Sequence, residues 1–327
     1  MVLHAIAIAA LAALLGHTEA DAAETARYPI RPIRFIVPFP PGGGTDTVAR
    51  IISGPLGKRL GQQIVIDNRG GANAIIGSEL AANAPPDGYT ILFVIQANMA
   101  VNPTLYDKLP YDPQRDFAPV ILLDTLAQLL VVNPSLPVKT VGDLIQMARA
   151  KPGQLNFSSS GHGSSSHLAG ELLNTMAKVD MVHVPFKGGG PANLAVITGQ
   201  VQLTIGIMVA LIPHVSAGKV RAVAVATPKR VQSLPDVPTI AETLPGYDSL
   251  VWHGVMVPTR TPRPIVRTLN AALNDVLRQP EIQARLTQSG VQPAGGTPEE
   301  FAALIKSETA KYAKLLRQVG LAGSEKR

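Results

Sequence analysis

Short apolar runs alternate along the chain with stretches whose apolar residues recur at helical spacing. The runs are four to seven residues long, rich in β-branched side chains, and end at glycine, proline or polar clusters. Continuous apolar runs of this kind are typical of strands that are buried on both faces. Their alternation with helices predicts an α/β protein in which mainly parallel sheets are flanked by helices. The expected strands are 33–38, 63–67, 90–95, 129–132, 181–184, 201–205, 220–226 and 251–257.

Capping residues mark the starts of several helices. Thr140 and Asp143 have the spacing of a capping box, and residues 297–300 combine an N-cap, a proline at N1 and an acid at N3. Pro191 is expected at N1 of another helix. Pro55 interrupts a further helical stretch, and an interior proline costs roughly 3 kcal/mol, so we expect a break or kink there. The expected helices are 140–150, 166–176, 191–198 and a long C-terminal helix from 297.

Two proline-rich loops divide the chain into lobes. The loops 102–119 and 228–245 contain four prolines each, and the strand expected after the second loop would return to the first lobe. We therefore expect lobe 1 to comprise 23–125 and 247–327, and lobe 2 to comprise 126–246. A lobe that interrupts another in this way leaves a cleft beside two chain crossings.

Composition narrows the possible functions. The chain has 327 residues, of which 46% are apolar and 16% charged, which is enough for a large core. The formal charge is +6, but no basic run occurs and aromatic residues make up only 4%, so a nucleic-acid partner is not expected. The absence of cysteine excludes disulfides, thiolate metal sites, a cysteine nucleophile and a lipid-modified N-terminal cysteine.

The first 22 residues have the features of a secretory signal peptide. An apolar run of eleven residues, Ala5 to Leu15, precedes Ala20-Asp21-Ala22, which fits a cleavage site after Ala22. A membrane-spanning helix needs about 20 apolar residues, so this run is too short to be an anchor. We expect a soluble, periplasmic protein.

The stretch 33–51, IRFIVPFPPGGGTDTVARI, places glycines between a strand and a helix. Backbone amides at a helix start bind anions, and glycine lets the ligand come close to the backbone. The dinucleotide motif fails because Thr47 stands at the third glycine position, and the P-loop motif fails because Thr45-Asp46 follows the glycines. A carboxylate or oxyanion site remains, as does a simple tight turn. Asp46 is more consistent with capping or tethering the loop than with chemistry.

The stretch 155–173, LNFSSSGHGSSSHLAGELL, repeats the order of short strand, Gly/Ser loop and helix. The nucleophile elbow G-x-S-x-G is absent, so polar ligand contacts or a capped, solvated turn are favoured over hydrolysis. His162, His167 and His183 lack the i, i+4 histidine spacing of metal sites, and no metal is expected. A third glycine run, 188–190, follows Lys187, which is either an anion contact or a rim residue.

The chain resembles the periplasmic solute-binding receptors of tripartite tricarboxylate transporter systems, often called Bug receptors. The resemblance extends from about residue 28 to 320. It is carried by YPIRPIRFIVPFPPGGGTDTVARI, IVIDNRGG, APPDGYTILF, AVNPTLYDKLPYDPQRDFAPV, NFSSSGHGSSSHLAGELL, VHVPFKGGGPAN, LPDVPTIAETLPGY and GGTPEEFAALIKSE. It implies a two-lobed periplasmic-binding-protein fold of type II, a Venus flytrap, which closes on a small organic acid. It also implies a monomer that delivers this ligand to the membrane subunits of a transporter.

The resemblance and the motifs together suggest which residues meet the ligand. The first lobe's loop would bind a carboxylate through amides and ordered waters, and the serine loop would meet the ligand from the other lobe. Amino-acid-binding members carry an aspartate where this chain has Gly206, so we expect no ammonium recognition there. The expected ligand-binding residues are Phe39, Pro41, Gly42, Gly43, Thr45, Asp46, Asn98, Ser159, Ser160, Gly161, Ser164, Ser165, Ser166 and Gly206.

Two other functions remain as alternatives. The protein could present its ligand to a signalling partner rather than to a transporter. An enzyme acting on a carboxylate is less consistent with the sequence, because nothing assembles a nucleophile, a base and an orienting group, and no cofactor motif is complete.

Overall fold

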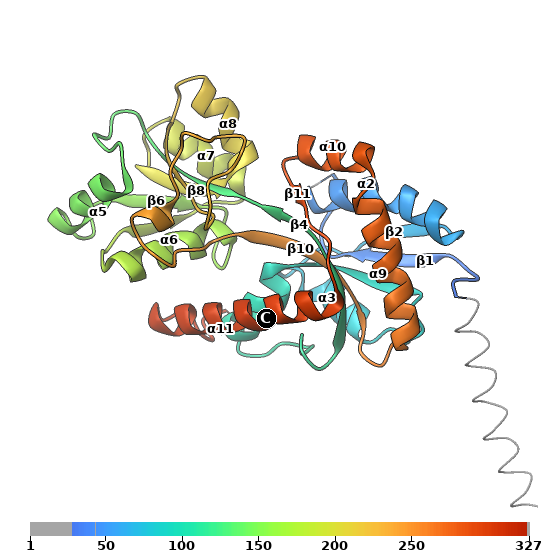
Figure 1. Ribbon diagram of the computed structural model, residues 1–327. Coiled ribbons are helices and arrows are strands. Elements are labelled where there is room, and N and C mark those ends of the chain that lie inside the picture. Colours follow the sequence, from blue (N-terminus) through green and yellow to red (C-terminus); the bar gives the residue numbers. More distant parts are fainter. Residues whose placement is uncertain (1–27, 43, 326–327) are drawn as a thin grey trace, which may run out of the picture.

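The computed structural model describes residues 28–42 and 44–325, which form two lobes side by side (Figure 1). Each lobe contains one sheet with helices packed against it, so the two-lobed α/β fold is confirmed. The expected signal peptide and Gly43 lie outside the described residues. No helix in the described part of the chain is long and apolar enough to cross a membrane.

The sheet of lobe 1 has six strands in the order β11-β4-β10-β3-β1-β2. The pairs β1–β2 and β1–β3 are parallel, whereas β10 runs antiparallel to both β3 and β4. The strands are β1 (Ile33–Val37), β2 (Ile64–Asn68), β3 (Thr90–Ile95), β4 (Phe117–Leu126), β10 (Val251–Pro258) and β11 (Gln292–Pro293).

Helices cover both faces of this sheet. Apolar side chains of α2, α9 and α10 pack on one face, and those of α3 and α11 pack on the other. The elements are α2 (Gly44–Leu60), α3 (Ile75–Ala82), the π-helical turn η1 (Ala97–Val101), α4 (Asn102–Leu105), α9 (Arg263–Leu277), α10 (Pro280–Gln288) and α11 (Pro298–Gln318).

The sheet of lobe 2 has five strands in the order β7-β6-β8-β5-β9. Again two pairs, β6–β7 and β6–β8, are parallel and two, β5–β8 and β5–β9, are antiparallel. The elements are β5 (Gln128–Val132), α5 (Val141–Ala150), β6 (Asn156–Ser159), α6 (Ser165–Ala177), β7 (Val182–Pro185), α7 (Gly189–Ile197), β8 (Leu203–Ile207), α8 (Met208–Ser216), β9 (Arg221–Val225) and the 3-10 turn η2 (Ile240–Glu242).

Three expectations need correction. The sheets are mixed rather than mainly parallel, because the strands that lead between the lobes run against their neighbours. Helix α2 continues through Pro55, and its buried residues Ile52 and Leu56 hold the two halves on one core. Pro191 is the third residue of α7 rather than N1. The amides of a first helical turn have no partner within the helix, so proline is tolerated there as well.

The registers show which edge of each sheet faces the other lobe. In lobe 1, β10 enters from lobe 2 and its His253 pairs with Ile95, the last residue of β3. In lobe 2, β5 enters from lobe 1 and its Gln128 pairs with Ile207, the last residue of β8. The carboxyl ends of the parallel strands therefore face the partner lobe on both sides. Ligands of open α/β sheets bind at this edge.

Candidate functional site

The loop after β1 brings backbone amides to the cleft edge of lobe 1. Gly42 has φ +84°, a left-handed conformation that suits glycine, and α2 begins at Gly44. The loop is exposed at Pro41 and Gly42, whereas Phe39 packs against the core of lobe 1. The N-terminus of α2 therefore lies shortly after the end of β1, where its first amides are available to an anion.

Asp46 holds this loop in place. Its carboxylate accepts hydrogen bonds from the Gly42 amide at 2.9 Å, from Arg50 Nε at 2.8 Å and from Asn68 Nδ2 at 3.0 Å. The side chain is 2% exposed. The Arg50 hydrogen bond, together with those from Gly42 and Asn68, lowers the pKa of Asp46 to about 2 against the opposing effect of burial. This geometry favours the tethering role over direct ligand contact.

Asn98 is used within the fold in a similar way. Its Oδ1 accepts from the Ile95 amide at 2.8 Å, and its Nδ2 donates to Ser78 Oγ at 2.9 Å. The side chain is fully buried. Asn98 therefore shapes the turn after β3, and a direct ligand contact from its amide stays a prediction.

Lobe 2 contains a pocket of about 300 Å³ at its cleft edge. The first residues of α6 and α7 border it, together with Ala210 and His214 of α8, so two helix N-termini and the end of β8 converge on one space. No residue in this lining is a lysine, arginine, aspartate or glutamate. Neutral donors at helix starts can hold an anion without a charged side chain. The lining consists of Ser160, Ser165, Ser166, Gly189, Gly190, Ala192, Asn193, Thr204, Gly206, Ile207, Ala210 and His214.

The other expected residues of lobe 2 build the serine loop behind this pocket. Ser164 is the N-cap of α6 and its hydroxyl donates to the Gly161 carbonyl at 2.7 Å. Ser159 Oγ accepts from the Gly161 amide at 3.1 Å, and the Ser160 amide donates to Ser166 Oγ at 2.9 Å. The structure thus brings Ser160, Ser165, Ser166 and Gly206 to the pocket, and it uses Ser159, Gly161 and Ser164 to shape the loop.

Three histidines meet behind the serine loop, a juxtaposition that sequence spacing did not predict. One ring nitrogen each of His162, His167 and His183 lie within 4.8 Å of one another. The rings of His167 and His183 stack with centroids 3.6 Å apart and an interplanar angle of 14°. Their in-plane lone pairs therefore lie in nearly parallel planes and do not converge on one ion, as a tetrahedral metal site requires.

Hydrogen bonds indicate a positioning role for these rings. His167 Nδ1 accepts from the Gly163 amide at 3.1 Å, and His183 Nε2 lies 2.5 Å from Ser159 Oγ. Burial, and then the charges of His183 and His162, lowers the pKa of His167 from 6.5 to about 3. Burial, and then the charge of His162, lowers the pKa of His183 to about 4. Both rings are neutral at neutral pH and brace the serine loop.

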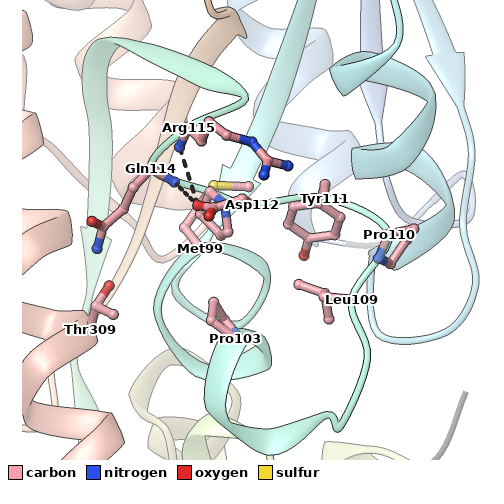
Figure 2. A pocket seen from close by; sticks show the side chains of 10 residues that line it. Met99, Pro103, Leu109, Pro110, Tyr111, Asp112, Gln114, Arg115 and Thr309 are labelled. Atoms are coloured by element: carbon pink, nitrogen blue, oxygen red, sulfur yellow. Dashed lines mark hydrogen bonds between the residues drawn. The ribbon is translucent and has the colours of Figure 1, made fainter.

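A second hollow, in lobe 1, does not have the features of the site. Its volume is about 540 Å³, and it lies between η1, the loop 109–115 and Thr309 of α11 (Figure 2). None of the expected ligand residues lines it. The carboxylate of Asp112 accepts from the amides of Gln114 and Arg115, so its polar groups already have partners in the loop.

A family model decides the relationship of the chain to known proteins. The model described as the tripartite tricarboxylate transporter family receptor, TctC, matches residues 48–321. The chain belongs to this family. Its members are solute-binding receptors, which agrees with the two lobes and with a pocket at the cleft edge.

Individual relatives cover nearly the whole receptor. The UPF0065 protein in the tcbD–tcbE intergenic region of Pseudomonas sp. (strain P51) is 44% identical, over 88% of this chain and 86% of that protein. The structure of R. palustris Rpa4515 with adipate has a TM-score of 0.78 and 38% identity, over 90% of this chain and 99% of that one. MatC (Rpa3494) from Rhodopseudomonas palustris with bound malate has a TM-score of 0.74 and 36% identity, over 88% and 100%.

Eight of the twelve residues that line the pocket lie outside the expected set. Asn193, Thr204 and His214 lie outside the expected set, although the stretch 183–203 was noted for its glycines. Lys187, the anion contact considered there, is exposed and does not line the pocket. The sequence signal that could have pointed to these residues was the third strand–glycine–helix junction. It repeats the order of strand, glycine loop and helix seen at the serine loop.

Proposed function

We propose that this receptor captures a small organic carboxylate between its lobes and delivers it to a tripartite tricarboxylate-type membrane transporter. The observation that carries the proposal is the lobe 2 pocket, where helix N-termini and neutral hydroxyls converge without any charged lining. The similar proteins named with adipate and with malate support an acid as ligand.

Several finer points belong to the same proposal. The protein acts as a periplasmic monomer that binds its ligand without turning it over. Lobe 2, with bounds 126–246, closes against lobe 1, with bounds 23–125 and 247–327, so that the β1 loop and the serine loop hold one ligand. Presentation of the ligand to a sensor protein is the alternative outcome.

The direct test is mass spectrometry of small molecules released from the purified protein, followed by a thermal-shift screen of organic acids. A ligand that binds only the folded state raises the melting temperature with concentration. We expect an acid in the released material and a rise with the same acid. Binding of a sugar or a cation, with no response to any carboxylate, would refute the proposal.

Turnover and oligomeric state are tested separately. Incubation of the receptor with the acid found above should return the acid unchanged, and appearance of a product would indicate an enzyme. Size-exclusion chromatography with light scattering should give the mass of one chain with and without ligand.

A further inference from the structure

Asn193 lies in the middle of α7, is 8% exposed and lines the lobe 2 pocket. Its side-chain amide has no hydrogen-bond partner within the described residues, yet its atoms are not closed off from solvent, so the amide opens into the pocket. A ligand that displaces water from this amide must replace the lost hydrogen bonds. The amide is therefore a ready contact for a polar group of the ligand.

Gly206 lies beside the end of the Asn193 side chain. A Cβ atom at Gly206 would lie 3.4 Å from Asn193 Oδ1 and 3.2 Å from Leu211 Cδ1. The end of the Asn193 side chain therefore lies beside the position from which a side chain at residue 206 would project. The space that an acidic side chain at residue 206 would occupy therefore borders the side-chain amide of Asn193.

Two neighbouring polar side chains in the lining already have partners. Thr204 Oγ1 donates to the Ser158 carbonyl at 2.9 Å, and Ser166 Oγ accepts from the Ser160 amide at 2.9 Å. The His214 ring also lines the pocket, but it lies on α8 rather than beside Gly206. Asn193 on α7 lies beside the end of β8 and offers the ligand both a donor and an acceptor, as the Ser165 hydroxyl at the start of α6 also does.

We propose that Asn193 is the specificity-determining residue of this pocket, and that it hydrogen-bonds a second oxygen function of the bound acid. This inference rests on the proposed function, because it assumes that a carboxylate occupies the cleft. A hydroxyl, a carbonyl or a second carboxylate of the ligand accepts from Asn193 Nδ2. An ammonium group gains no opposite charge there, so amino acids are disfavoured.

The test is titration calorimetry on the wild-type protein and on Asn193→Leu with matched four- and six-carbon acids. The probes are butanoate, 2-hydroxybutanoate, 2-oxobutanoate, 2-aminobutanoate, succinate, hexanoate and adipate. Leucine matches asparagine in size but removes both hydrogen-bonding groups. We expect the wild type to bind at least one acid with a second oxygen function roughly tenfold or more tighter than its plain or amino counterpart. Asn193→Leu should lose that preference while its affinity for the plain acid stays unchanged.

Two further variants separate recognition from folding. Asn193→Ala removes the same amide with a smaller side chain and should weaken the preferred acid, even if Asn193→Leu does not fold. Leu194→Asn changes the adjacent residue of α7, which is 56% exposed, and should leave every affinity unchanged.

The outcomes distinguish this inference from the function on which it rests. If the wild type prefers an acid and both Asn193→Leu and Asn193→Ala keep that preference, the role of Asn193 is wrong but the receptor function stands. If no acid of the panel binds the wild type, both fail.

Discussion

At the scale of single residues, Asp46 shows how one buried carboxylate shapes a ligand loop. Its partners lie on three segments: the loop itself, the next turn of α2 and the end of β2. Because the carboxylate is the common acceptor, its loss would release the glycine loop from both the helix and the strand. The effect on the ligand is indirect, through the shape of the loop.

Asp46→Asn should therefore lower both stability and affinity. Asparagine keeps only one acceptor oxygen and carries no charge, so either the donors of Gly42 and Arg50 or the donor of Asn68 must face an NH2 group. We expect this to reduce the free energy of unfolding by about 1–3 kcal/mol. Urea denaturation measures the stability, and calorimetry with the preferred acid measures the affinity. Thr47→Ser, an exposed change in the same turn, should have little effect on either. Unchanged stability of Asp46→Asn would show that the tether is unimportant.

The pH dependence of this tether follows from its lowered pKa. The pKa of Asp46 is about 2 in the folded protein against 3.8 as the ordinary value, so the unfolded state takes up the proton first as the pH falls. The stabilisation is therefore complete above pH 3.8 and is lost between about pH 3.8 and 2. Denaturation curves of Asp46→Asn and wild type should converge over this interval.

The buried histidines produce a different pH window. The pKa values of His167 and His183 are lowered from 6.5 to about 3 and about 4, so the unfolded state binds protons that the folded state does not. Stability should be highest above pH 6.5 and should fall as the pH drops toward 4. His167→Asn keeps an acceptor for the Gly163 amide but cannot titrate. Its urea midpoint should fall less between pH 7.5 and 4.5 than that of the wild type, and an equal fall would contradict this account.

At the scale of elements, glycines decide how closely helices approach the sheets. A Cβ atom at Gly254 of β10 would lie 2.2 Å from Phe301 Cζ of α11 and 2.8 Å from the Ile121 carbonyl oxygen. Helix α11 can therefore pack on this strand only because residue 254 has no side chain. The Phe301 ring is 1% exposed and also meets Trp252 edge to face.

Gly254→Ala should destabilise the protein by about 1–3 kcal/mol, because an extra methyl group overpacks a filled core. Gly142→Ala is the matched control: the position is exposed in α5, and a Cβ there would meet only Thr140 Oγ1 at 3.6 Å, an ordinary contact. The control should be neutral or stabilising by up to about 1 kcal/mol. Urea denaturation of the two variants measures both changes in stability. Equal effects of the two changes would contradict the packing argument.

Local signals explain which elements could be predicted from the sequence. The capping boxes at Thr140 and Thr297 are present as expected, since each depends on residues three positions apart. Strand β4 was missed because Pro119 was attributed to a proline-rich loop. In the structure Pro119 pairs with Met256 beside a register shift, where the missing amide is tolerated.

The residues of the candidate site also differ in how far local sequence signals could predict them. The glycine and serine loops were predicted because a strand, a glycine run and a helix start are neighbours in the sequence. Asn193 and the histidine cluster were not, because their roles depend on contacts between elements: α7 with β8, and α6 with β7. Such contacts depend on the packing of the whole lobe. They therefore produce no motif of fixed spacing in the sequence.

At the scale of the whole molecule, Trp252 is placed to report movement of the lobes. It lies near the start of β10, is 1% exposed, and its Nε1 donates to Glu308 Oε2 at 3.3 Å. Gln96 Nε2 donates to the same carboxylate and to the Leu250 carbonyl, which precedes β10. A bend of this crossover would alter the surroundings of the indole.

Trp252 is the only tryptophan in the sequence. Saturation with the preferred acid should therefore change the intrinsic tryptophan fluorescence. Trp252→Phe should remove the signal excited at long wavelength while calorimetry still detects binding. Glu308→Gln keeps the ring but alters its hydrogen bond, and should shift the emission of the free protein. Ligand binding with no spectral change would show that this crossover does not move.

The neutral pocket also predicts how salt affects binding. The formal charge of +6 is spread over the chain, and the pocket lining contains no lysine, arginine or acid. Salt screens the distant charges but hardly affects hydrogen bonds from buried amides. Raising sodium chloride from about 50 to 500 mM should change the dissociation constant by less than roughly threefold. A change of tenfold or more would indicate a charged clamp elsewhere.

The pairing of the two crossovers has a consequence for engineering. Leu126, at the end of β4, lies opposite Val251, at the start of β10, and Ser249 Oγ donates to Gln128 Oε1 at 2.9 Å just beyond them. The segment between these positions thus leaves and rejoins the chain at adjacent points. This segment, which is lobe 2, can therefore be exchanged between relatives, because its two ends lie next to each other. A chimaera carrying the lobe 2 of a relative would reveal which half of the molecule dictates the choice of cargo.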